Sequence, residues 1–299
     1  MSTPRVAVVI LTWNDGELLD AALASALAST GVDVEVVVVD NGSEPPATVP
    51  ADARVLLLRN EANRGVAAAR NQGAGATDAP LVLFLDSDAR LHPDTLERLC
   101  RPMAASPDVA LVAPVFDGQA PEASAGRAPS LGRKVARVLG RTAEYAPAER
   151  RPGDPAWDVD FAIGACQLVR RAAFDEVEGL DEAFFYGPED VDFCLRLRDA
   201  GWRVVQVPGA GCHHPPRRRH RRLLTRAGAR HAWAVSRHLW RHRDRSRPLA
   251  PCRRVPVTAR PRPAALDVVV VGYRSEDVVE RCVRAARQIP GCASVIVVD

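Results

Sequence analysis

Apolar and polar positions alternate along the N-terminal half of the chain in a strand–helix rhythm. The run 81–85 (Leu-Val-Leu-Phe-Leu) has no polar face, which is typical of a strand buried on both sides. The pattern predicts strands at residues 6–12, 34–40, 54–59 and 81–85. It predicts helices at residues 17–29, 66–75 and 94–105. This order favours an α/β fold whose mostly parallel sheet is flanked by helices on both faces.

The second half is less regular. Residues 117–155 are rich in Pro, Gly, Ala and Arg, and a loop of this length inside a domain is usually functional. Beyond it we expect a strand at 160–171 that includes Gly164-Ala165, an amphipathic helix at 190–200 and a strand at 202–207.

Polar residues follow three of the predicted strands directly. Open α/β sheets bind ligands beyond the carboxyl ends of their strands. The rule gathers three segments along one crevice: Thr12-Trp13-Asn14, Asp40-Asn41-Gly42 and Asp86-Ser87-Asp88.

Two carboxylates at the end of a buried strand are costly unless a cation or hydrogen-bond donors lie beside them. A hard divalent cation bridging to a phosphate would explain Asp86-Ser87-Asp88. The alternative is an Asp-rich turn that precedes a helix N-cap.

Composition narrows the class of protein. The 299 residues are 47% hydrophobic, which excludes general disorder. We expect a cytoplasmic protein, because residues 1–5 lead straight into a strand and no apolar stretch reaches the roughly 18–20 residues that span a bilayer. The seven cysteines form no Cys-x-x-Cys pair, so we expect reduced thiols.

The net charge of +3 conceals a basic segment. Residues 217–262 contain sixteen arginines and one acidic residue, Asp244. Such a segment suits contact with an anionic membrane or phosphorylated acceptors, although it could simply be a solvated helix face. It has few aromatic residues, so we expect no nucleic-acid partner.

These features predict four parts: an α/β domain at 1–216, a basic helix at 217–244, a Pro/Arg-rich linker at 245–264, and a partial unit at 265–299. The last part repeats the pattern of residues 6–40, strand, aromatic turn, helix, strand and Asp. It reads as the truncated start of a second, similar domain.

Six motifs occur in an order that resembles family 2 glycosyltransferases of the GT-A fold, nearest to bacterial rhamnosyl- and galactofuranosyl-transferase-like enzymes of cell-envelope assembly. The similarity covers about residues 5–215. The motifs are VVILTWN, VVVVDNGS, NEANRGVAAARNQG, LVLFLDSDA, the block GACQLVRRAAFDEVEGLDEAFFYGPEDVDFCLRLRDAGWRV, and VPGAGCHH.

The resemblance implies a donor site for a nucleoside-diphosphate sugar. Its predicted residues are Thr12, Trp13, Asn14, Asp40, Asn63, Gly65, Arg70, Asp86 and Ser87. Asp40 would contact the base, and the helix that starts at Gly65 could direct N–H groups at phosphate. Simpler alternatives are core packing for Trp13, helix capping for Asn14 and a surface position for Arg70.

The resemblance also implies a divalent cation, Mn²⁺ or Mg²⁺, on the donor diphosphate. Asp88 would be the direct ligand, Asp86 would hold ribose or metal, and His213 would complete the shell or bind phosphate. His214 competes for that role, and a solvated loop position is the simpler alternative for His213.

The acceptor-side block implies the chemistry. Asp190, next to Glu189, is the candidate base for the acceptor hydroxyl, and Gly164, Ala165 and Tyr186 are expected on the acceptor side. One displacement with one base inverts the anomeric configuration. Alternatively, both acids favour a helix N-terminus, and Asp181 and Asp192 suit capping or surface roles.

We therefore expect an inverting, metal-dependent transferase that uses a UDP- or dTDP-sugar and a glycan or polyprenyl-linked acceptor, with peripheral contact at the inner membrane face. One alternative is a sugar-nucleotide-binding or regulatory module that is inactive without its second domain. A nucleotidyltransferase is disfavoured, because TWNDGE lacks the Gly-rich basic loop of such enzymes.

Overall fold

A computed structural model describes residues 3–127, 155–215, 237, 266–271 and 292–298. The chain divides into two units, Met1–Arg254 and Val255–Asp299, which are described separately. Among the described residues, no helix combines the length and apolar character needed to cross a bilayer.

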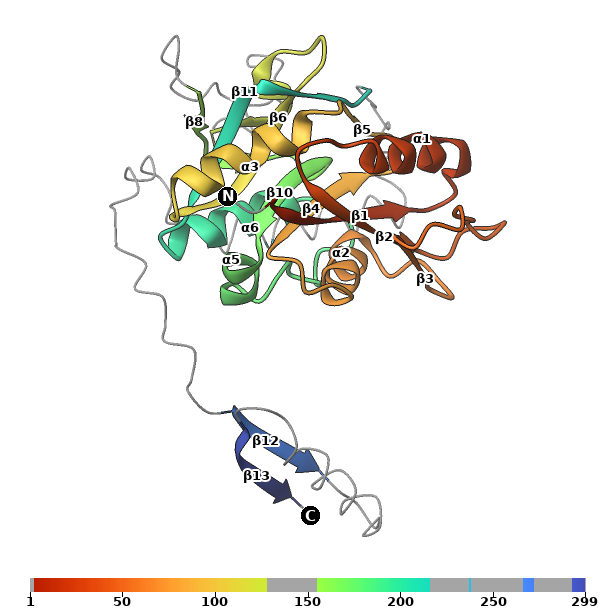
Figure 1. Cartoon of the computed structure of the whole chain (residues 1–299), viewed down its shortest axis with the longest axis vertical. Helices are drawn as coiled ribbons and strands as arrows, with labels where there is room; N and C mark the ends of the chain where they lie inside the picture. The colour runs from red at the N-terminus through yellow and green to blue at the C-terminus, as the bar shows by residue number, and fades with distance from the viewer. Residues whose placement is uncertain (1–2, 128–154, 216–236, 238–265, 272–291, 299) are drawn as a thin grey trace. The chain divides into compact units, whose positions relative to one another are not determined.

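The first unit is built on a nine-stranded, mixed sheet (Figure 1). Its main path runs β3-β2-β1-β4-β10-β6-β11-β5, with β8 paired to β11. The strands on this path are β3 (Val55–Arg59), β2 (Asp33–Asp40), β1 (Arg5–Thr12), β4 (Leu81–Asp86), β10 (Cys166–Arg170), β6 (Val109–Phe116), β11 (Arg203–His213) and β5 (Arg90–Leu91), and β8 is Trp157–Asp158. The four strands from β3 to β4 are mutually parallel, as the sequence pattern predicts.

Helices cover both faces of this sheet. On one face, α1 (Gly16–Leu27) packs on β1 and β2, and α3 (Thr95–Ala105) packs on β6 and β11. On the other face lie α2 (Val66–Gly75), α5 (Arg171–Glu176) and α6 (Glu189–Asp199). Helix α2 lies so close to the sheet that a Cβ on Gly73 would be 2.4 Å from Cγ1 of Val9, which explains its small residues.

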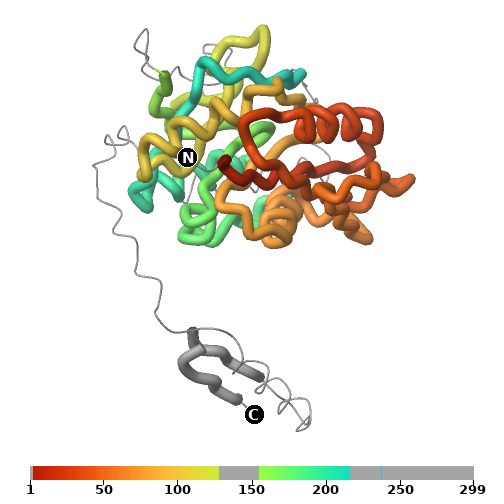
Figure 2. The backbone as a smooth tube through the Cα atoms, in the orientation of Figure 1, coloured from red at the N-terminus to blue at the C-terminus, as the bar shows by residue number. Residues whose placement is uncertain are grey.

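The antiparallel strand β10 pairs with both β4 and β6 and therefore joins the two parallel parts of the sheet. In Figure 2 this green strand runs beside the orange β4, although about eighty residues separate them. The sequence pattern left β6 unassigned. It also merged β9 (Phe161–Ala162) and β10 into one strand, whereas a turn through Gly164 separates them.

Strand β11 is longer than expected and reaches His213. Part of the irregular segment also has structure, namely the 3₁₀ turn η1 (Pro121–Ala123) and β7 (Ala125–Gly126), which pairs with β9. The rest of that segment and nearly all of the basic segment lie outside the described residues.

In the second unit, β12 (Leu266–Val271) and β13 (Cys292–Val298) pair in parallel. These strands fall where the repeat pattern predicts them, and the helix expected between them lies outside the described residues. The assignment of residues 265–299 to a second catalytic-type domain stays a prediction.

Candidate active site

The carboxyl ends of β1, β2 and β4 meet at one edge of the sheet. Leu11 pairs with Asp86 and Thr12 pairs with Asp40, so the polar residues that end these strands lie in adjacent positions. The polar strand ends that the sequence predicts to gather therefore lie at the same edge of the sheet.

The tip of β4 carries a cluster that could hold a metal ion. The potential ligand atoms of Asp86, Asp88 and His214 all lie within 4.8 Å of one another. Nε2 of His214 is 3.6 Å from Oδ1 of Asp88, and its ring packs on Phe116. Two carboxylates and one imidazole are a donor set that suits Mn²⁺.

The prediction of His213 as a ligand is not supported by its position. Because β11 continues to His213, side-chain alternation buries Cys212 and leaves His213 exposed beside the edge strand β5. His214 follows the strand and lies next to Asp88.

Asp40 is fully buried and is engaged by its own loop. Its Oδ1 accepts the N–H of Ser43 at 2.8 Å, and its Oδ2 accepts the N–H of Ala47 and the guanidinium of Arg59. Burial raises the pKa of Asp40, but the hydrogen bonds from Ser43 and Ala47 and the charge of Arg59 lower it overall. The position fits shaping of the 43–47 loop better than the expected contact with a base.

The loop after β1 is tied to its neighbours. Asn14 donates its N–H to Oγ of Ser43 and accepts the N–H of Glu44, so it bridges two loops and does not cap α1. Ser87 is buried and donates its hydroxyl to Asp15 at 3.0 Å, where the sequence predicted a nucleotide contact. Trp13 is 46% exposed and is therefore not a core residue.

A pocket of about 280 Å³ opens between these two loops. It is lined by Thr12, whose buried hydroxyl has no hydrogen-bond partner among the residues that the structure describes. Its wall includes Asn14, Ser43 and Ala47. Three acidic residues also line it, Asp15, Asp20 and Glu44.

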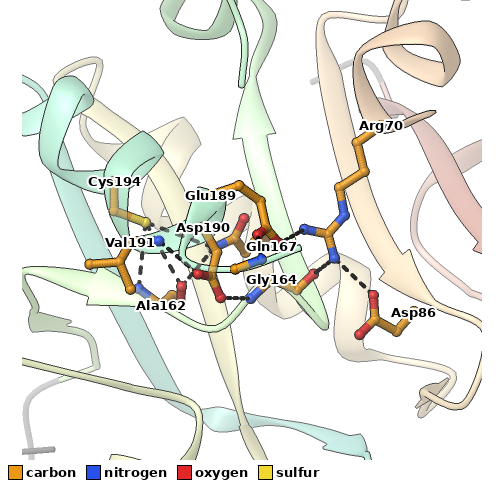
Figure 3. A network of polar contacts seen from close by, with 10 residues as sticks. Arg70, Asp86, Ala162, Gly164, Gln167, Glu189, Asp190, Val191 and Cys194 are labelled. Carbon is orange, nitrogen blue, oxygen red and sulfur yellow. Dashed lines mark hydrogen bonds and ion pairs between the residues drawn. The ribbon is translucent and has the colours of Figure 1, made fainter. Parts of the chain in front are cut away.

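Arg70 lies at the centre of a buried polar network (Figure 3). Its Nη2 donates to Oδ1 of Asp86 and to the carbonyl of Gly164, both at 2.8 Å. Its Nη1 lies 3.5 Å from Oε1 of Glu189. Both sequence-based alternatives for Arg70, a phosphate contact and a surface position, disagree with this burial.

The acidic pair Glu189-Asp190 begins α6 and lies on the far side of the Gly164 turn from Asp86 (Figure 3). Oδ2 of Asp190 accepts the N–H of Gly164 at 3.0 Å, and Oδ1 accepts the N–H of Val191 at 2.8 Å. Glu189 is buried and accepts the N–H of Gly187.

Burial is the main cause of the raised pKa values of Glu189 and Asp190. It raises the pKa of Glu189 to about 7, with the charge of Asp190 adding to the rise and Arg70 opposing it. Burial also raises the pKa of Asp190, against the N–H of Gly164 and the charge of Arg70. A carboxylate with a raised pKa is suited to accept a proton.

Gly164 and Ala165 connect the two sides. Gly164 contacts Arg70 through its carbonyl and Asp190 through its N–H, and the carbonyl of Ala165 accepts the N–H of Asp86 at 3.0 Å. A Cβ on Gly164 would lie 2.5 Å from Nη1 of Arg70, so a side chain here would disrupt the network.

The start of α2 is covered by the loop 181–188. Gly65 has a φ of +91°, and the N–H of Val66 donates to the carbonyl of Phe185 at 2.8 Å. This first N–H of α2 is therefore not directed at a phosphate as expected. Tyr186 is 50% exposed, consistent with its predicted place on the acceptor side.

Asn63 and Asn41, which was predicted near the site but not as a donor-binding residue, fix this turn. The side-chain carbonyl of Asn63 accepts the N–H of Gly65 and the amide of Asn41. Asn41 is buried and also bonds the carbonyl of Gly65, the N–H of Arg64 and the side chain of Asn60. Its place after a strand-end Asp was the available signal. Asn63 thus holds the loop, and no nucleotide contact follows from its geometry.

Asp192 and Asp181 were both predicted at a cap or at the surface, and the structure places them differently. Asp192, expected at a cap or the surface, is fully buried and pairs with Arg196 at 2.8 Å. Asp181 accepts the N–H of Ala183, as a capping residue does, and lies 3.3 Å from Arg237 of the basic segment.

Comparison with known proteins shows the family of this chain. Residues 7–178 match the family model of glycosyl transferase family 2. The chain is 33% identical over 237 residues to the N-acetylglucosaminyl-diphospho-decaprenol L-rhamnosyltransferase of Mycobacterium tuberculosis, a match that covers 71% of this chain and 76% of the relative.

Two solved structures share the fold. One is GalNAc-T7 with UDP, GalNAc and Mn²⁺, with a TM-score of 0.58 and 17% identity over 71% of this chain and 44% of that one. The other is the mannosyltransferase PcManGT from Pyrobaculum calidifontis with GDP-Man and Mn²⁺, with a TM-score of 0.56 and 18% identity over 83% and 66% of the chains. At these identities the likeness shows the GT-A-like α/β fold alone.

Proposed function

The chain belongs to glycosyl transferase family 2, and we propose that it moves a sugar from a UDP- or dTDP-sugar to a hydroxyl of a glycan or polyprenyl-linked acceptor, with inversion. The observation that carries the proposal is that carboxylates lie on both sides of Gly164. Asp86 and Asp88 lie on one side with His214, and Asp190 lies on the other.

We place the nucleoside of the donor in the pocket beside Thr12. The acidic residues around this pocket would repel phosphate, whereas Thr12, Asn14 and Ser43 offer polar groups to an uncharged base or ribose. The phosphates would then extend along the strand ends toward Asp86 and Asp88.

Asp86, Asp88 and His214 would hold the divalent cation. A cation bound there would stabilise the negative charge that develops on the leaving diphosphate. The known structures with this fold that contain Mn²⁺ support the choice of metal.

Asp190 is the proposed base. Its carboxylate would accept the proton of the acceptor hydroxyl as that oxygen bonds to the anomeric carbon and the bond to the diphosphate breaks. A retaining route needs a second carboxylate as nucleophile. Glu189 is a poor candidate for it, because it is buried against the N–H of Gly187 and faces Arg70.

The relatives support the proposed class of acceptor. The Mycobacterium tuberculosis relative is named for rhamnosyl transfer to a diphospho-decaprenol saccharide, so we propose a deoxyhexosyl or hexosyl donor and a polyprenyl-linked or glycan acceptor of the cell envelope. The exposed Phe185 and Tyr186 would face that acceptor. The basic segment would contact anionic lipid at the inner membrane face.

The test is calorimetric titration of the protein with UDP and dTDP, with and without Mn²⁺, followed by a transfer screen of the sugars of the preferred nucleotide. We expect Mn²⁺ to raise nucleotide affinity by about tenfold or more. Asp88→Ala should remove this dependence, whereas Asp78→Ala, which changes a carboxylate that is 89% exposed, should keep it. Nucleotide binding without transfer to any acceptor would favour a binding module, and no nucleotide binding would refute the proposal.

A further inference from the structure

Arg70 has no role in the chemistry proposed above, yet it contacts both halves of the site. It extends from α2 to the tip of β4 and to the turn between β9 and β10 (Figure 3). Its side chain is only 4% exposed. A phosphate of a bound donor could not reach this guanidinium in the described conformation.

Three carboxylates surround this one cation. Asp86 comes from β4, and Glu189 and Asp190 come from α6. Burial opposes the charge of Arg70, but these three neighbours together raise its pKa, so the guanidinium stays charged. The thiol of Cys194 also faces Asp190, and burial raises its pKa to about 12, so it adds no charge at neutral pH.

Resting on the proposed function, we propose that Arg70 is a positioning residue that couples the metal-side carboxylate Asp86 to the base Asp190 through the Gly164 turn. The carbonyl of Gly164 is held by Arg70, and the N–H of the same residue is held by Asp190. Any movement of the guanidinium therefore moves the hydrogen bond that orients the base.

The geometry requires arginine. The Nη2 atom donates to two acceptors at 2.8 Å, while Nη1 faces Glu189 and makes no hydrogen bond within the described part of the chain. A planar guanidinium supplies these directions at once, whereas a lysine ammonium is a single point charge.

The charge of Arg70 also sets the ionisation of the base. It lowers the pKa of Asp190 and of Glu189 against the effect of burial. Without this charge the pKa of Asp190 would be higher. The base would then stay protonated up to a higher pH, and turnover would be lost over that added pH range.

The experiment compares Arg70→Gln and Arg70→Lys with wild type, and uses Arg101→Gln as a matched control, because Arg101 is 65% exposed on α3. Nucleotide affinity with Mn²⁺ is measured by calorimetry, and kcat for transfer is measured from pH 5 to 9. We expect Arg70→Gln to keep the nucleotide Kd within about threefold and to move the acidic limb of kcat upward by about one pH unit.

Arg70→Lys keeps the positive charge but loses the planar guanidinium with its two Nη donor groups. It should leave the acidic limb in place and lower kcat about tenfold at every pH. Arg101→Gln should change neither quantity. If Arg70→Gln weakens nucleotide binding and leaves the acidic limb of kcat in place, Arg70 contacts the donor and the inference is overturned. A loss of kcat that is equal at every pH in Arg70→Gln would also overturn it.

Arg70→Gln leaves buried carboxylates without their cation and could fail to fold. The double variant Arg70→Gln/Glu189→Gln also removes one of these buried carboxylates. Comparing the acidic limb of its kcat with that of Glu189→Gln alone then shows the effect of removing Arg70. If the wild type binds no nucleotide, the proposed function fails. The coupling is then tested by a double-mutant cycle of unfolding with Arg70→Gln and Asp190→Asn, which should show non-additive effects.

Discussion

Oδ2 of Asp190 accepts the backbone N–H of Gly164 at 3.0 Å, while Oδ1 accepts the N–H of Val191. The carboxylate is therefore oriented by the backbone on two sides before any acceptor arrives. An orientation fixed in this way favours proton transfer, because the base does not have to search for its geometry.

Asp190→Asn should reduce transfer by about 10²–10⁴-fold, since an amide cannot accept the acceptor proton. Nucleotide affinity with Mn²⁺ should stay close to wild type, because Asp190 lies on the opposite side of Gly164 from Asp86. Transfer assays and calorimetry measure the two quantities. Asp199→Asn, an exposed change at the other end of α6, is the control. An Asp190→Asn enzyme as active as this control would exclude Asp190 as the base.

The adjacent histidines provide a second test. His214→Ala should weaken Mn²⁺-dependent nucleotide binding about tenfold, because Nε2 of His214 lies beside Oδ1 of Asp88. His213→Ala is the matched control and should have no effect, since that side chain is exposed at the end of β11. Calorimetry at several Mn²⁺ concentrations distinguishes them, and the opposite ranking would return the metal role to His213.

Buried Glu189 makes stability depend on pH. Burial first, and then the charge of Asp190, raise its pKa to about 7 from an ordinary value near 4.5. The folded protein therefore binds this proton more tightly than the unfolded chain, and stability should fall as pH rises through that window. Above it the ionised carboxylate is buried at full cost.

Glu189→Gln removes this cost. Its free energy of unfolding relative to wild type should be higher at pH 8 than at pH 5 by up to about 3 kcal/mol. Urea unfolding at both values measures the difference. Glu17→Gln, which changes an exposed glutamate in the first turn of α1, controls for the loss of a helix-terminal charge. An equal effect of Glu189→Gln at both pH values would contradict the raised pKa.

Local patterning predicts the N-terminal half of the fold well. Helix α2 has the limits expected for it, and the strands that end at Thr12, Asp40 and Asp86 meet as strand-end geometry requires. Continuous apolar runs with a polar end are unambiguous signals, because only a doubly covered strand buries them fully.

Those parts of the fold and of the candidate site that local patterning does not predict depend on contacts between distant parts of the chain. Arg70 looks like a surface helix residue until β10 brings Gly164, which is ninety-four residues away, to its guanidinium. Likewise, His213 and His214 can be ranked only when the end of β11 is known. Strand β10 inserts antiparallel between β4 and β6, and nothing local to its sequence specifies those partners.

Gly65 offers a final test, of the contact between α2 and the acceptor-side loop. Its φ is +91°, and an added Cβ would lie 2.9 Å from both Cδ2 and the carbonyl oxygen of Phe185. Gly65→Ala should therefore cost about 1–3 kcal/mol of stability. It should also displace the loop that carries Phe185 and Tyr186, because the N–H of Val66 holds that loop through the carbonyl of Phe185.

The matched control lies in the same helix. Gly75 has open space where a Cβ would be added, so Gly75→Ala should be neutral or stabilising by about 0.5–1 kcal/mol. Urea unfolding measures both variants, and steady-state kinetics separate the donor from the acceptor. We expect Gly65→Ala to raise the acceptor KM more than the nucleotide Kd, because the displaced loop is the one that we propose to face the acceptor. A variant that weakens nucleotide binding and leaves the acceptor KM unchanged would instead assign this helix start to the donor, as the phosphate-binding expectation from the sequence requires.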